Sequence, residues 1–168
     1  LVDDMGANDV GYASTDLAFA TPSMDALAAD GVRLARYYTL PSCTPARAAL
    51  LTGRYASSVG MGYDAIGSFW LPSSYGLPLA HTLLPQALRA RGYATHMVGK
   101  WNVGTAREAF WPHRRGFDTF LGFHGDQARY YSHKAFGTAD DTFCDLSEAD
   151  AATGIHVGDC HDGEYSTD

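Results

Sequence analysis

The 168 residues contain no apolar run long enough to cross a lipid bilayer, and the opening Leu1-Val2-Asp3-Asp4 does not read as a secretory signal peptide. Internal repeats, heptads and low-complexity tracts are also absent. These absences argue against a transmembrane, coiled-coil or fibrous protein. The 46% hydrophobic and 18% charged residues are instead typical of a globular protein that buries one ordinary core.

Basic residues are missing from residues 135–168, which hold nine acidic residues. The formal net charge of −7 therefore comes from this segment, because residues 1–134 have ten acidic residues against twelve basic ones. Such an acidic segment is typical of a solvated loop, and calcium binding by the run from Asp140 and Asp141 to Asp150 is the weaker alternative. A nucleic-acid-binding protein would carry a basic stripe, so we expect no nucleic-acid partner.

Cysteine is scarce, with three residues in all, and no Asn-x-Ser/Thr acceptor for N-glycosylation is present. If Cys43 is reactive, Cys144 and Cys160 remain to close the polar loop between them as a disulfide. That arrangement suits an exported protein. The alternative is two free thiols in a reducing compartment.

The most informative stretch is 42–54, which reads Ser-Cys-Thr-Pro-Ala-Arg-Ala-Ala-Leu-Leu-Thr-Gly-Arg. It predicts a helix that is capped by one of its first three residues and closed by Gly53. Cys43 would lie at the helix N-terminus, where unpaired amides and the helix dipole favour an anion. Arg47, four residues on, would place a guanidinium on the same face. Taken alone, such a cysteine is more often a small core residue than a nucleophile.

Leu1 and Val2 read as the end of a buried strand that runs directly into Asp3 and Asp4. In open α/β sheets, ligands gather outside the carboxyl ends of strands, so the two adjacent carboxylates are placed to hold a cation. Without further information, adjacent aspartates in a turn are more often simply exposed to solvent.

The rest of the chain predicts alternating helices and strands. Helices are expected over 21–31, with Leu27 facing the sheet, and over 81–92, with Thr82 as the N-cap. A strand is expected over 32–38, a strand followed by a turn over 93–102, and a basic turn followed by a strand over 112–122. Lys100 would then emerge at the carboxyl end of its strand, whereas His96 would pack within it.

The pattern Cys43-x-Pro45-x-Arg47, followed by Leu-Thr-Gly-Arg, resembles the signature of the sulfatase family. The resemblance covers nearly the whole chain and includes the Asp-Asp pair at its start and the segment Gly-Lys-Trp at 99–101. In that family the cysteine is oxidised to formylglycine (3-oxoalanine) by a formylglycine-generating enzyme. The hydrated aldehyde then supplies the oxygen that attacks sulfur in a sulfate ester.

The resemblance implies a role for each matching residue. Cys43, as formylglycine, would be the nucleophile, and Arg47 would orient and stabilise it. Asp3 and Asp4, together with the modified Cys43, would ligate calcium. Lys100 would contact the sulfate of a sulfated small molecule or sulfated glycan. Further metal ligands, a second lysine and a histidine would come from downstream chain.

The implied fold is the α/β alkaline-phosphatase-like sandwich, with a mostly parallel central sheet and helices on both faces. Sulfatases run much longer, so we expect residues 1–168 to be the N-terminal portion of one catalytic domain, without an internal boundary. Three segments, Tyr-Tyr-Ser-His at 130–133, Thr-His-Met-Val-Gly-Lys at 95–100 and Arg-Arg-Gly-Phe-Asp at 114–118, resemble the arylsulfatase B branch, which removes 4-sulfate from N-acetylgalactosamine. A secreted, lysosomal or otherwise exported protein is implied. Arg114 and Arg115 could touch a polyanionic sugar, although a surface pair is the commoner explanation.

Asn102 departs from the family pattern, which reads Gly-Lys-Trp-His at this point. In sulfatases that histidine is thought to help release sulfate, and asparagine cannot carry a proton at neutral pH. Asn102 would therefore preserve substrate binding while putting turnover in doubt. The alternative is a catalytically impaired pseudo-sulfatase that acts as a binding or structural component. A phosphoryl-transfer enzyme of the same superfold is less favoured, because those relatives generally use Ser or Thr as nucleophile.

Overall fold

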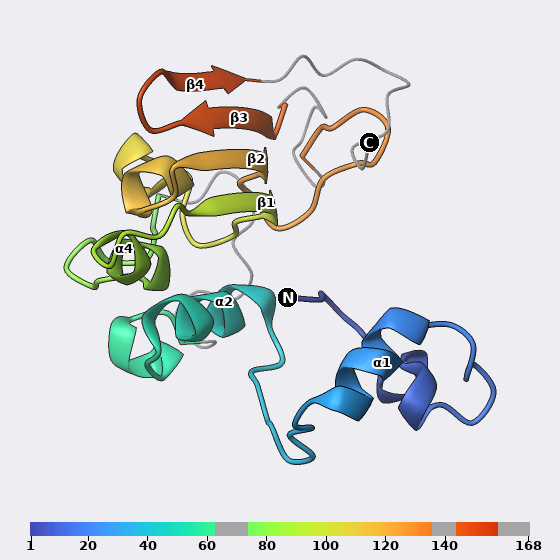
Figure 1. Ribbon diagram of the computed structural model, residues 1–168. Helices are drawn as coiled ribbons and strands as arrows, with labels where there is room; N and C mark the ends of the chain where they lie inside the picture. Colours follow the sequence, from blue (N-terminus) through green and yellow to red (C-terminus); the bar gives the residue numbers. More distant parts are fainter. Residues whose placement is uncertain (63–73, 136–143, 158–168) are drawn as a thin grey trace. The chain divides into compact units, whose positions relative to one another are not determined.

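The computed structural model describes residues 1–62, 74–135 and 144–157 (Figure 1). They belong to two compact units, Leu1–Thr39 and the described part of Leu40–Asp168. No helix within these ranges is long and apolar enough to cross a membrane. Asp140, Asp141 and Cys160 lie outside the described residues, so the calcium alternative and the Cys144–Cys160 disulfide stay predictions.

The first unit is built around helix α1 (Pro22–Asp30), which follows the 3-10 turns η1 (Ala7–Asp9) and η2 (Gly11–Ala13). The helix begins after Thr21 and ends before Gly31, as the sequence predicts. Asp25 in its first turn accepts hydrogen bonds from the Tyr12 amide and the Thr21 hydroxyl, both at 3.0 Å. These bonds tie η2 to α1.

Three expectations for the first unit are wrong. Leu1 and Val2 form no strand, and neither do residues 32–38. A strand needs a hydrogen-bonded neighbour, and no described strand pairs with either segment, so Leu1 is 87% exposed and Val32 is 90% exposed. Leu27 of α1, which was expected to be packed, has a side chain that is 75% exposed.

The second unit contains a four-stranded sheet in the order β1-β2-β3-β4. The strands are β1 (His96–Lys100), β2 (Thr119–Phe123), β3 (Leu146–Asp150) and β4 (Gly154–Val157). β1 and β2 pair in parallel, while β2 with β3 and β3 with β4 pair antiparallel. The α/β class is confirmed, with β1 and β2 lying where strands were expected.

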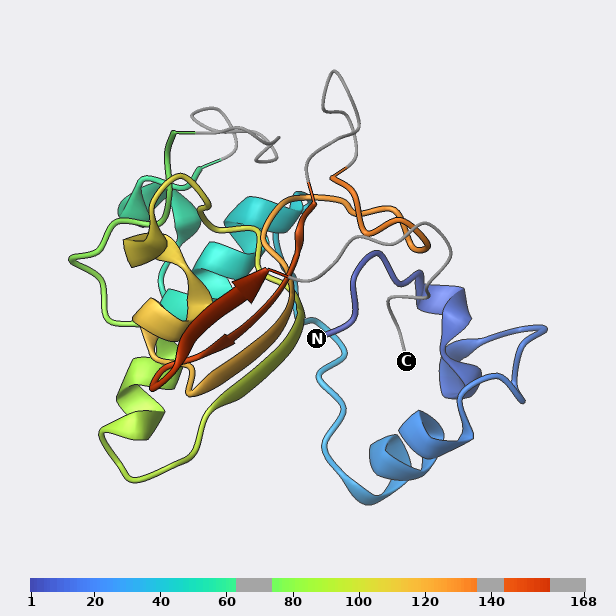
Figure 2. The ribbon, with the colours of Figure 1, turned by 90° about the horizontal axis from the view of Figure 1, so that it is seen from above.

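One face of this sheet is buried. Figures 1 and 2 show helices α2 (Cys43–Thr52) and α4 (Leu84–Arg89) on the same side of it. Alternation along the strands turns Phe120 of β2 and its neighbour Ala149 of β3 towards the core, whereas Val98 is 81% exposed. The core also contains Ala48, Ala56, Val59, Met61, Leu77, Leu83, Trp101 and Val103.

Helix α4 begins at Leu84, and its N-cap is Leu83 rather than the predicted Thr82. Pro85 lies in the first turn, and the Gln86 side chain reaches back to accept the Leu83 amide at 2.8 Å. This bond satisfies an amide at the helix start without a hydroxyl cap. Leu83 is then free to bury its side chain in the core.

Arg115 is buried rather than part of a surface pair. Its guanidinium donates to the carbonyl oxygens of Leu77 at 2.7 Å, His81 at 3.1 Å and Pro78 at 3.4 Å. Burial lowers its pKa. Arg114 does lie at the surface, 2.7 Å from Glu108. Arg115 therefore joins the segment before α4 to the residues that lead into β2.

Gly122 and Gly99 face each other in the β1–β2 register. A Cβ at Gly122 would lie 2.0 Å from the Gly99 carbonyl oxygen, so Gly122→Ala must push the two strands apart. We expect it to lower the free energy of unfolding by about 2 kcal/mol or more in urea titration. Gly62→Ala is the control, because its Cβ would meet nothing closer than 3.5 Å. Equal stabilities of the two variants would contradict the close approach.

Candidate active site

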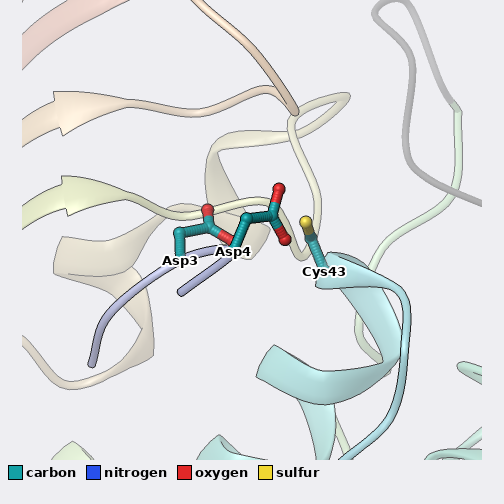
Figure 3. Close-up of side chains that lie close together, drawn as sticks. All are labelled: Asp3, Asp4 and Cys43. Carbon is teal, nitrogen blue, oxygen red and sulfur yellow. The ribbon is translucent and has the colours of Figure 1, made fainter. Parts of the chain in front are cut away.

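Cys43 is the first residue of α2, as predicted, and Figure 3 shows its sulfur at the start of the helix. The N-cap is Ser42, which has an extended backbone and makes no side-chain capping bond. Gly53 closes the helix in the left-handed conformation, with φ 64°. Thr44, Pro45 and Ala48 are buried and anchor α2 to the core. The helix N-terminus, with its favourable field for an anion, is therefore held by packing.

Two hydrogen bonds join the first turns of α2 to the carboxyl end of β1. The buried Thr44 hydroxyl donates to Asn102 Oδ1 at 3.0 Å. The Arg47 guanidinium donates to the Lys100 carbonyl oxygen. Within the second unit, these contacts bring the helix that carries Cys43 and Arg47 against the segment that carries Lys100 and Asn102.

Lys100 is the last residue of β1, so it lies at the carboxyl end of its strand as predicted. Its Nζ atom is 3.2 Å from Asp126 Oδ1. The two side chains are only 9% and 11% exposed, so this ion pair is shielded from solvent. Lys100 is thus not an ordinary solvated surface lysine.

Asn102 is fully buried and has a positive φ of 58°, which asparagine tolerates better than most residues. Its amide N–H donates to the His124 carbonyl at 3.1 Å. Its side-chain nitrogen Nδ2 has no hydrogen-bond partner among the described residues. A buried donor without a partner is costly.

His96 does not pack within its strand as expected, because its ring is exposed and shares a 2.8 Å hydrogen bond with Thr119 Oγ1. It is the first residue of β1, whereas Lys100 is the last. His96 therefore lies at the opposite end of the strand from Asn102 and cannot replace the missing family histidine.

Sequence reasoning missed four polar residues of this region: His124, Asp126, Asp145 and Ser147. The first two directly follow β2, so the sheet-edge rule applied to Lys100 would also have found them. Asp145 directly precedes β3, which runs antiparallel to β2 and so begins at the edge where β2 ends. Only the strand pairing reveals that position.

Asp145 and His124 are buried at this edge with shifted pKa values. The Asp145 carboxylate accepts the His124 amide at 2.9 Å and the Gly125 amide at 2.8 Å, and burial nevertheless raises its pKa to about 6. Burial, helped by the nearby His113, lowers the pKa of His124 to about 4. Its Nε2 atom is 2.6 Å from Ser147 Oγ. Between pH 4 and 6, folding therefore favours a protonated Asp145 and a neutral His124.

Asp3 and Asp4, the predicted calcium ligands, belong to the first unit. Both are exposed, and Asp4 has a positive φ of 53°. Figure 3 shows their carboxylates on consecutive residues of the N-terminal segment. Carboxylate oxygens are the ligands that calcium prefers, so the chemistry of this pair fits the predicted metal.

The two shifted pKa values predict opposite pH dependences of stability. Stability contributed by Asp145 is lost as pH rises from about 4 to about 6, while that of His124 is lost as pH falls from about 6.5 to about 4. Relative to wild type, Asp145→Asn should therefore lose stability on acidification. His124→Gln should lose it on raising the pH, each by on the order of 2 kcal/mol. Urea unfolding from pH 4 to 7 measures both, and slopes of the same sign would contradict the assignment.

Comparison with known proteins agrees with the motifs. The family model "Sulfatase" matches residues 1–167. The chain is 41% identical to arylsulfatase J of Mus musculus over 168 residues, covering 99% of this chain and 26% of that protein. It is 46% identical to arylsulfatase A of Homo sapiens over 123 residues, covering 71% of this chain and 23% of that protein.

The structure of this chain is also similar to solved structures. The PsFucS1 sulfatase from Pseudoalteromonas sp. superposes with a TM-score of 0.69 and 27% identity, covering 94% of this chain and 34% of that one. Ps i-CgsB in complex with k-i-k-neocarrahexaose superposes with a TM-score of 0.61 and 32% identity, covering 77% of this chain and 28% of that one. The expected alkaline-phosphatase-like α/β fold is thereby confirmed. The chain spans about a quarter of the length of the curated relatives it matches. It belongs to the sulfatase family.

Proposed function

We propose that this chain is part of a calcium-dependent sulfatase that hydrolyses sulfate esters, with Cys43 as the residue converted to formylglycine. The observation that carries the proposal is the attachment of the Cys43 helix to the end of β1 through the bonds Thr44–Asn102 and Arg47–Lys100. Family membership supplies the reaction class. Because the relatives are about four times longer, the remaining catalytic groups are expected elsewhere in a longer polypeptide.

Formylglycine and calcium would supply the nucleophilic oxygen and the divalent charge that favours its ionised form. Arg47 lies four residues after Cys43, and its bond to the Lys100 carbonyl orients a permanent positive charge near the helix start. The Lys100 ammonium, which is ion-paired with Asp126, would turn N–H donors towards the ester oxygens. These donors would stabilise the negative charge that develops as the S–O bond breaks.

Asp3 and Asp4 are the proposed calcium ligands, together with the modified Cys43. Two adjacent carboxylates repel each other, and a divalent cation relieves that repulsion. Their exposure leaves the carboxylate oxygens accessible to an ion.

Asn102 is proposed to bind substrate through its Nδ2 donor, which has no partner among the described residues. It can donate to a sulfate or hydroxyl oxygen but cannot shuttle a proton as the family histidine would. This substitution is also the observation that favours the second candidate, a pseudo-sulfatase that binds sulfated ligands with little or no turnover.

The substrate is proposed to be a sulfated glycan or a related sulfated small molecule. Support comes from Ps i-CgsB, whose structure contains k-i-k-neocarrahexaose. The N-acetylgalactosamine 4-sulfate branch rests only on the resemblance of residues 95–100, 114–118 and 130–133. Maturation by a formylglycine-generating enzyme and an exported location, secreted or lysosomal, are proposed on the basis of family membership.

Mass spectrometry of the peptide that carries Cys43 tests the modification. We expect the peptide from protein matured in its own host to have lost sulfur and gained an aldehyde that reacts with hydrazide reagents. Cys144 is the internal control and should keep its sulfur. A fully intact Cys43 thiol would count against the enzyme and favour the pseudo-sulfatase.

Release of a fluorogenic aryl sulfate by the full-length protein tests the catalytic roles. Removal of calcium by a chelator should abolish turnover, and added calcium should restore it. Arg47→Ala should lower kcat/KM by about 100-fold or more, because a charge close to the reacting group is lost. Arg54→Ala is the matched control, since Arg54 follows α2 and is exposed, and it should change activity little. Absence of turnover in a modified, calcium-loaded protein would retire the hydrolase proposal.

A further inference from the structure

We propose that Asp145 and Asp126 are positioning residues that act on substrate only through Lys100. Asp145 holds the loop after β2 in place, and Asp126 on that loop holds the Lys100 ammonium. The inference rests on the proposed contact of Lys100 with sulfate and extends it to residues that no sequence motif identifies.

The loop after β2 is hydrogen-bonded through its backbone on two sides. The carbonyl groups of Phe123 and His124 accept the amides of Trp101 and Asn102 at 2.9 and 3.1 Å. The amides of His124 and Gly125 donate instead to the Asp145 carboxylate. The loop is therefore fixed both to the continuation of β1 and to the residue that precedes β3.

Asp126 is the next residue along this loop. Its Oδ1 atom lies 3.2 Å from Lys100 Nζ, and both side chains are about nine-tenths buried. The contact is an ion pair without hydrogen-bond geometry, because Oδ1 has no hydrogen-bond partner among the described residues. A lysine side chain has four rotatable bonds, so a charged partner at a fixed point greatly reduces the positions its ammonium samples. Any movement of the loop would move that partner.

The side-chain chemistry of Asp145 suits it to holding the loop after β2. An ionised carboxylate is acceptor-only and can receive two amide donors, one on each oxygen. Asparagine has nearly the same shape but would direct its own NH2 group at one of the two amides. Asp145→Asn therefore breaks one contact of the loop while keeping the volume of the buried site.

Asp150 offers a matched control at the other end of β3. Its carboxylate also accepts two backbone amides, those of Ala152 at 2.6 Å and Thr153 at 3.2 Å. It is not part of the segment that contacts Lys100. Both amides donate to the same oxygen, Oδ1, which asparagine retains, so Asp150→Asn makes the same Asp-to-Asn change without touching the loop after β2.

Amine labelling measures the restraint on Lys100 without any need for turnover. The chain has two lysines, Lys100 and Lys134, so peptide mass spectrometry after a short pulse of acetic anhydride resolves both. In the full-length protein, Asp126→Asn and Asp145→Asn should each raise the labelling rate of Lys100 by about 5-fold, because a shielded ammonium becomes accessible. Asp150→Asn should leave it unchanged. Unchanged Lys100 labelling in both of the first two variants would overturn the proposal.

Kinetics on an aryl sulfate then separate positioning from a general loss of structure. Asp145→Asn should lower kcat/KM by about 10-fold in the wild-type background and have little further effect when Lys100 is already alanine. Equal losses in both backgrounds would overturn the proposal. If Asp145→Asn fails to fold by circular dichroism, Asp126→Asn replaces it in the same cycle. A wild-type protein without turnover would refute the proposed hydrolase and leave the labelling experiment to decide the positioning role.

Discussion

The arrangement of the second unit depends on how α2 is attached to the end of β1. Thr44 is buried on the first turn of the helix and bonds to Asn102, while Arg47 one turn later bonds to the Lys100 backbone. A helix N-terminus attracts anions only in a local region, so its usefulness depends on what lies beside it. Here the attachment places a positively charged helix start beside a strand end that carries a lysine.

A second layer of buried polar groups supports this edge of the sheet. His124, Asp145 and Ser147 are all nearly inaccessible to solvent, and each has a hydrogen-bond partner. Buried polar groups of this kind are costly when left unsatisfied, and satisfied ones favour one particular backbone arrangement. Burial raises the pKa of Asp145 and lowers that of His124, so burial, rather than attraction between the two side chains, is the main cause of both shifts.

Much of the candidate active site could be predicted from local sequence and the family resemblance. The Cys43 helix, its glycine terminator, the strand that ends at Lys100 and the Asp-Asp pair are all short motifs whose meaning depends on neighbours in the chain. The strands assigned to residues 1–2 and 32–38 were wrong for a related reason. A strand is stabilised by partners elsewhere in the chain, and alternation of residue types does not reveal whether those partners are present.

The sequence by itself determined the candidate site residues: a cysteine that opens a helix, an arginine one turn later, a lysine at a strand end and paired carboxylates. Only the tertiary structure decided that Arg115 is buried and donates hydrogen bonds to the segment before α4, and that Asp126 forms an ion pair with Lys100. It also decided that the Asp145 carboxylate accepts two backbone amides of the loop after β2. The reason is that helix periodicity and capping act over a few residues, whereas these contacts join segments about 20 to 40 residues apart through strand pairing and core packing.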